Sequence, residues 1–104
     1  MSPDHYHVLV EPMADRKFAY HIEFLARVNE LAAAQLYESY EEAIEYLQST
    51  PESCPPYFPQ LPSDSELRCK LFGKRYRIVF EILGDEVYIY DIQDCRQDED
   101  KNLI

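Results

Sequence analysis

The chain has 104 residues, of which 46% are hydrophobic and 13% aromatic, so it can bury one modest core but not two. Its formal charge of −10 disfavours a general nucleic-acid-binding protein, because phosphate contacts need clustered lysine and arginine. No apolar run approaches the ~20 residues of a membrane span, and the first residues lack the charged and apolar blocks of a signal peptide. We therefore expect a single cytoplasmic domain over residues 1–104.

The first predicted element is a short strand over His5–Glu11, which Pro12 ends. Its apolar face carries Tyr6, Val8 and Val10. His5 and His7 share the other side, but nothing nearby completes a set of metal ligands, so we expect ordinary polar residues. The three cysteines show no paired spacing. We therefore expect free thiols and neither a metal nor a cofactor.

Two helices follow, and together they predict a helical hairpin. Apolar residues recur at helical spacing from Met13 to Val28, with Asp15 as an early-turn acid or cap. Asn29 is a polar break and a typical N-cap, so it predicts a second helix that runs to about Ser49.

Four carboxylates lie three and four residues apart on the second predicted helix: Glu38, Glu41, Glu42 and Glu45. Like charges at this spacing destabilise a helix by a few tenths of a kcal/mol per pair. The stripe is therefore either a solvated face or a surface that a basic partner would neutralise.

Five prolines fill the segment from Thr50 to Ser65, which excludes a helix or a central strand there. Tyr57 and Phe58 are its predicted anchors onto the core.

The stretch Leu67–Arg96 predicts three consecutive strands joined by tight turns at Gly73-Lys74 and Gly84-Asp85. Side chains two apart on a strand share a face. The apolar rows are Leu67, Cys69 and Leu71 on the first strand and Tyr76, Ile78, Phe80 and Ile82 on the second. If both rows face one core, the cations converge on the open face of the sheet: Arg68, Lys70 and Arg77.

The predicted order is strand, two-helix hairpin, loop and three-stranded antiparallel meander. This order indicates an α+β domain whose helices pack on one face of a small sheet.

This combination is similar to the RelE/ParE superfamily of type II toxins. The specific part is LRCKLFGKRYRIVFEILGDEVYIYDI followed by Cys95-Arg96: a basic strand, a turn, an arginine-bearing strand, a Gly-Asp turn and an apolar strand that ends in basic residues. The end of the second helix, Leu47–Pro51, also resembles the family pattern. The resemblance implies a toxin that a cognate antitoxin holds inactive.

In the RelE branch, the resemblance implies an endonuclease that cuts messenger RNA on the ribosome without a metal. Arg68 and Lys70 match the paired basic positions of the family, Arg77 its phosphate-binding arginine, and Arg96 approximates a later arginine. Lys70 would then serve as general base, Arg77 would hold phosphate oxygens, and Arg96 would serve the leaving oxygen. We take this as the leading interpretation.

Two alternatives stay open. A ParE-like toxin would inhibit DNA gyrase by protein contact and would need no catalytic base, and a toxin-like protein that has lost catalysis would act through a partner. The strand cations favour RNA cleavage, whereas the acidic total favours the alternatives. The same cations also have a structural explanation, in which they pair with Glu81, Glu86 and other acids across the sheet.

Overall fold

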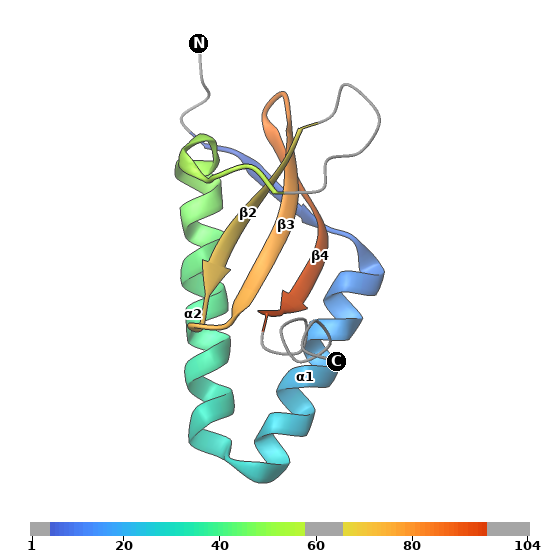
Figure 1. Ribbon diagram of the computed structural model, residues 1–104, viewed down its shortest axis with the longest axis vertical. Coiled ribbons are helices and arrows are strands. Elements are labelled where there is room, and N and C mark those ends of the chain that lie inside the picture. Colours follow the sequence, from blue (N-terminus) through green and yellow to red (C-terminus); the bar gives the residue numbers. More distant parts are fainter. Residues whose placement is uncertain (1–4, 58–65, 96–104) are drawn as a thin grey trace.

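The computed structural model describes residues 5–57 and 66–95, and their order of elements confirms the predicted α+β fold (Figure 1). The first strand begins two residues later than predicted. The elements are β1 His7–Val10, α1 Pro12–Val28, α2 Glu30–Ser49, the short 3-10 helix η1 Pro51–Ser53, β2 Leu67–Phe72, β3 Tyr76–Leu83 and β4 Glu86–Asp94.

The four strands form one open sheet in the order β1-β4-β3-β2. β2, β3 and β4 are the predicted antiparallel meander, while β1 pairs in parallel with β4. The position of β1 beside the C-terminal strand was not predicted. The register of β3 against β4 shifts between Val79 and Phe80, so Tyr90 of β4 has no residue opposite it on β3. Such a β-bulge increases the local twist of the sheet.

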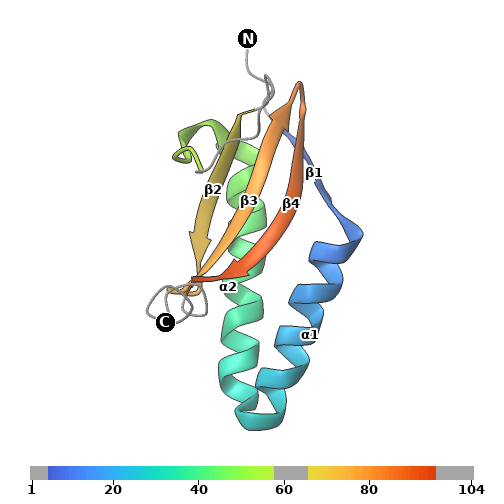
Figure 2. The same ribbon diagram turned by 45° about the vertical axis from the view of Figure 1, so that its right-hand side comes forward.

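The two helices form the predicted hairpin, which packs on one face of the sheet (Figures 1 and 2). Asn29 joins them: its amide donates to the carbonyl of Leu25 at 2.7 Å, and its side-chain oxygen accepts from the amide of Ala32 at 3.0 Å. At the start of α1 the carboxylate of Glu11, rather than Asp15, caps the first amides. Within the described part of the chain, neither helix is long and apolar enough to cross a membrane.

The core lies between the helical hairpin and the inner face of the sheet. Its large fully buried side chains are Leu47, Ile78, Phe80, Val87, Ile89 and Ile92. At the β2–β3 turn the core ends in a cluster of four rings, Phe18, Tyr40, Phe72 and Tyr76, with centroids of contacting pairs 4.3–5.8 Å apart. Burial of one such side chain contributes about 1.5–3 kcal/mol, so these rings decide which face of β2 turns inward.

Candidate functional site

The cations of β2 and β3 lie on opposite faces of the sheet. Lys70 stands opposite Ile78 and Arg68 opposite Phe80 in the antiparallel register. Directly opposed residues share a face, so Arg68 and Lys70 point to the helix side, where Ile78 and Phe80 are buried. Arg77 alternates with these core residues and lies on the other face. The predicted convergence of the three cations on the open face is wrong.

The physical reason is that Phe72, not Leu71, enters the core. The ring of Phe72 is 6% exposed and joins the aromatic cluster, whereas Leu71 is 61% exposed. Because adjacent residues of a strand point to opposite faces, inward placement of Phe72 also turns Lys70 and Arg68 toward the helices. The larger apolar side chain has determined the face of the whole strand.

Arg68 holds the loop that precedes β2. Its Nη1 donates to the carbonyl oxygens of Cys54 at 2.8 Å and Glu52 at 3.3 Å, and its Nη2 lies 3.5 Å from the carboxylate of Glu66. A β-bridge joins Arg68 to Pro56. The guanidinium is therefore part of the framework that fixes the loop against the edge of β2.

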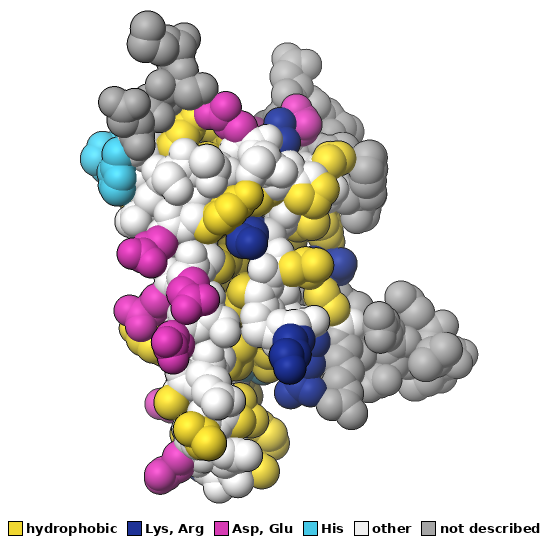
Figure 3. Space-filling model, turned by 90° about the vertical axis from the view of Figure 1, so that its left-hand side faces the viewer, with side chains coloured by type: hydrophobic (Ala, Val, Ile, Leu, Met, Phe, Trp, Pro, Cys, Tyr) yellow, Lys and Arg dark blue, Asp and Glu magenta, His cyan; other side chains and the backbone are white. Residues whose placement is uncertain are grey.

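Lys70 lies between β2 and α2. Its Nζ is 4.3 Å from the ring centre of Tyr46, a cation–π contact. A hollow of ≈300 Å³ beside it is also lined by Ser39 and Glu42. Figure 3 looks onto this side: basic side chains lie over β2 and the following turn, and acidic side chains follow α2. Lys70 thus lies at the boundary between the basic surface of β2 and the acidic surface of α2.

Arg77 lies on the face away from the helices. Its Nε donates to Oε1 of Gln93, the residue opposite it on β4, at 2.6 Å. The ring centre of Tyr57 is 5.1 Å from its guanidinium carbon. Tyr57 therefore anchors the proline-rich segment on the sheet face rather than in the core, and its predicted fellow anchor, Phe58, lies outside the described residues.

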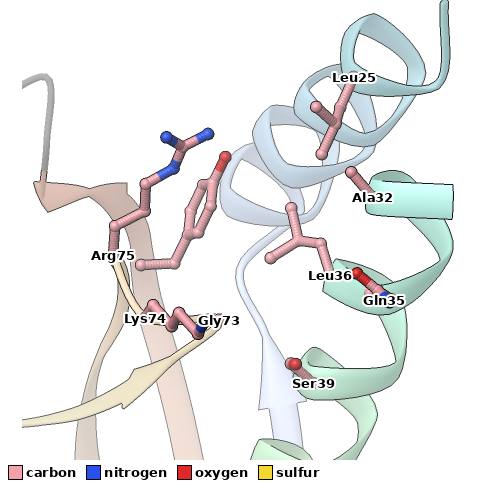
Figure 4. A pocket seen from close by; sticks show the side chains of 9 residues that line it. Leu25, Ala32, Gln35, Leu36, Ser39, Gly73, Lys74 and Arg75 are labelled. Carbon is pink, nitrogen blue, oxygen red and sulfur yellow. The ribbon is translucent and has the colours of Figure 1, made fainter. Parts of the chain in front are cut away.

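A pocket at the β2–β3 turn was not predicted. It has a volume of ≈430 Å³ and is bounded on the helix side by Leu25, Ala32, Gln35, Leu36 and Ser39. Figure 4 shows Leu25 and Leu36 reaching from the two helices toward the turn, with Arg75 across the opening. The sequence signal for this pocket is Gly73-Lys74-Arg75, in which a tight turn carries two neighbouring cations. The turn residues Gly73 and Lys74 have positive φ angles of 59° and 72°.

Glu81 is a buried acid on the face away from the helices, only 5% exposed. Its Oε1 accepts a hydrogen bond of 2.6 Å from the hydroxyl of Tyr90. The predicted pairing of strand cations with Glu81 does not hold for Arg68, which pairs with Glu66. A tyrosine hydroxyl, rather than a cation, is the hydrogen-bond donor that satisfies this carboxylate.

This contact predicts a pH effect. The hydrogen bond to Glu81, followed by burial, raises the pKa of Tyr90 from 10.0 to about 12. Because the folded value exceeds the unfolded one, the contribution to stability is complete below pH 10 and is lost as the pH rises through about 12. Glu81→Gln should lower the pKa of Tyr90 toward 10.0 in a titration of phenolate absorbance, read as the difference from a Tyr90→Phe variant. Glu86→Gln is the control, and an equal change there would contradict the contact.

The described arrangement does not bring the predicted catalytic set together. Arg68 and Lys70 lie on the helix face, Arg77 lies on the other face, and Arg96 is outside the described residues. Over residues 5–57 and 66–95, no three side chains of His, Cys, Asp or Glu gather at a metal-binding spacing. Chemically, the site can present cations to an anionic surface from two separate faces.

Comparison with known proteins agrees with this fold. The family described as the ParE toxin of the type II toxin–antitoxin system parDE matches residues 8–99. No curated protein matches the chain significantly. The matched range begins at the second residue of β1 and contains all the other helices and strands described above. The chain therefore belongs to the family of ParE toxins of type II toxin–antitoxin systems, and this membership implies a cognate antitoxin as its partner.

Proposed function

We propose that this toxin stops growth by binding a protein target, the type II topoisomerase DNA gyrase, and not by cutting messenger RNA. The observation that carries the proposal is the separation of Lys70 and Arg77 on opposite faces of the sheet. A toxin that inhibits by protein contact needs a complementary surface only, and the charged turn at Lys74 and Arg75 offers one. The proposal also places its action in the cytoplasm, where that enzyme works.

Cleavage of RNA by its own 2′-hydroxyl makes stricter demands. A base, a phosphate-binding cation and an acid must all reach one phosphodiester. Lys70 is held over Tyr46 on the helix side, while Arg77 is bonded to Gln93 on the other side. The net charge of −10 also repels an RNA backbone at long range. These features support the protein-contact mechanism.

One observation favours the second candidate, a RelE-type endonuclease. Arg77, Tyr57 and Gln93 gather on the face away from the helices, where an arginine and a tyrosine suit a phosphate and a base. In that mechanism Arg68, Lys70, Arg77 and Arg96 keep the roles implied by the resemblance, and Lys70 must reach the substrate from the helix side.

Induced expression in a bacterial host separates the two functions. The proposal expects growth arrest with a DNA-damage response and intact transcripts. Arrest with cleavage of messenger RNA at ribosome-occupied codons would instead support the endonuclease, and an absence of arrest would contradict both.

Substitution of the candidate base gives a second test. Lys70→Met should leave growth arrest unchanged if the toxin acts by protein contact, because no proton is transferred. An endonuclease would lose on the order of a hundredfold in rate, as is typical when one group that acts in the transition state is removed. Lys17→Met, which removes a cation paired with Asp91 at 3.1 Å, is the matched control. Thermal melting of each variant checks that the fold is kept.

A further inference from the structure

A groove of ≈590 Å³ lies between β1 and the flank of α2, away from the basic turn. Its apolar lining consists of Val8 and Val10 from the strand and Tyr40 and Ile44 from the helix. All four are partly buried against the core and partly open to the groove. The groove thus offers apolar contact area that the described part of the chain leaves uncovered.

The backbone of β1 adds hydrogen-bonding capacity beside this groove. β1 is an edge strand with β4 as its only neighbour in the described sheet. The amides of His7 and Glu11 donate at 2.9 Å to carbonyl groups in and just before β4. Because backbone groups alternate in direction along a strand, those of Val8 and Val10 point the other way, and no described residue bonds to them there. Such a free edge is a template for another strand.

At the first position of this edge, a residue of α2 already forms the hydrogen bond. The amide of Tyr6 donates to the carbonyl of Gln48 near the end of α2 at 2.8 Å. The outer side of β1 therefore forms a hydrogen bond at Tyr6. The same outward pattern continues at Val8 and Val10, where no residue of the ranges 5–57 and 66–95 is the partner.

The rim of the groove is strongly acidic. Glu38, Glu41, Glu42 and Glu45 line it, and no lysine or arginine of the described residues does. None of the four is in a salt bridge with any residue of the described ranges. Their spacing along α2 makes them repel one another by a few tenths of a kcal/mol per pair. A cationic occupant would relieve this repulsion, which gives the groove a definite charge preference.

We infer that this groove binds an extended, basic segment of a partner protein, which adds to the free edge of β1 as a fifth strand. Alternate side chains of such a segment fall on one face, so apolar residues at the inward positions would cover Val8, Val10, Tyr40 and Ile44. Lysines and arginines at the other positions have long flexible stems that can bend round the outer edge of the added strand and bring their charged ends to the carboxylates of α2. Strand addition uses the edge, the apolar floor and the acidic rim together. The inference does not depend on which enzyme the toxin inhibits.

Three synthetic peptides of equal length test the occupant. One alternates lysine and valine, the second has the same composition with all lysines before all valines, and the third alternates glutamate and valine. We expect saturable one-to-one binding of the first in titration calorimetry, at least about tenfold tighter than the second, and no binding of the third. In amide NMR spectra the largest shifts should occur at Val8 and Val10. Equal binding of the first two peptides would overturn the inference, because charge alone would then explain it.

Matched variants test the groove. Replacement of Glu38, Glu41, Glu42 and Glu45 by Gln should weaken the alternating peptide at least about tenfold. The control neutralises Glu23, Glu30, Asp85 and Glu86, four exposed acids outside the groove, and so changes the net charge equally. An equal loss in this control would overturn the inference.

Val10→Pro tests strand addition itself. Proline removes the outward amide of β1 but none of its bonds to β4, and an edge strand tolerates this change. Unchanged affinity in Val10→Pro would exclude strand addition, as would tighter binding of a helix-forming peptide of the same charge. A dimeric toxin that becomes monomeric when the four groove glutamates are changed would assign the groove to a second copy instead.

Discussion

Phe72→Ala is expected to lower the free energy of unfolding by about 3–5 kcal/mol, the range measured when a buried aromatic ring is truncated. The ring of Phe72 is 6% exposed, and its centroid lies 5.8 Å from that of Phe18 and 5.6 Å from those of Tyr40 and Tyr76. Truncation would therefore leave a cavity among three other rings. Chemical denaturation monitored by circular dichroism measures the change.

Leu71→Ala is the matched control, because it alters the neighbouring residue of the same strand. Leu71 is 61% exposed, so its truncation should change stability by no more than about 0.5 kcal/mol. The pair also tests the orientation of β2, since the sequence pattern alone predicts the opposite ranking. A larger effect at Leu71 than at Phe72 would mean that Arg68 and Lys70 face away from the helices after all.

Gly73→Ala should destabilise the toxin by about 2–3 kcal/mol for two separate reasons. Gly73 has a φ of +59°, where a side chain costs roughly 1–2 kcal/mol. A Cβ at this position would also lie 2.7 Å from Cδ1 of Leu36, so this side chain would have to move. Because Cδ1 ends a flexible side chain that borders the pocket at the turn, we expect an added cost of about 1 kcal/mol, the lower end of the range for overpacking. Equilibrium unfolding in urea would give the value.

Gly84→Ala separates the two reasons. Gly84 has a similar φ of +64°, but an added Cβ would meet nothing within 4 Å. This variant should therefore show only the backbone cost of roughly 1–2 kcal/mol. Equal losses at Gly73 and Gly84 would show that Leu36 moves away from the added Cβ without a measurable cost.

Local signals were sufficient to predict the elements of this fold. Asn29 marked the boundary between the two helices because its side chain caps α2, as the 3.0 Å bond to Ala32 shows. Gly73 and Gly84 marked the hairpins because both have positive φ. The pairing of β1 with β4 left no such signal, since a parallel neighbour is joined through the rest of the chain and not by a short turn.

The candidate site was harder to predict, because it depends on which face of β2 is buried. β2 has apolar side chains on both faces, Leu71 on one and Phe72 on the other, so alternation alone could not decide between them. Whether Leu71 or Phe72 is buried depends on aromatic rings of α1, α2 and β3, which come from separate segments of the chain. Arg77 was placed correctly on the open face because β3 has one clearly apolar row, with Ile78 and Phe80 fully buried.

The pairing of β1 with β4 also sets the order in which the toxin can mature. The helical hairpin and the β2–β3 hairpin consist of contacts between neighbouring segments, which form quickly. β1 has no place in the sheet until Glu86–Asp94 has been synthesised, and Val87, Ile89 and Ile92 of the core arrive with that strand. A chain that stops after β3 therefore lacks β4, the strand with which β1 pairs. Because closing a long loop costs more chain entropy than closing a short one, we expect β1 to join the sheet only after both hairpins have formed.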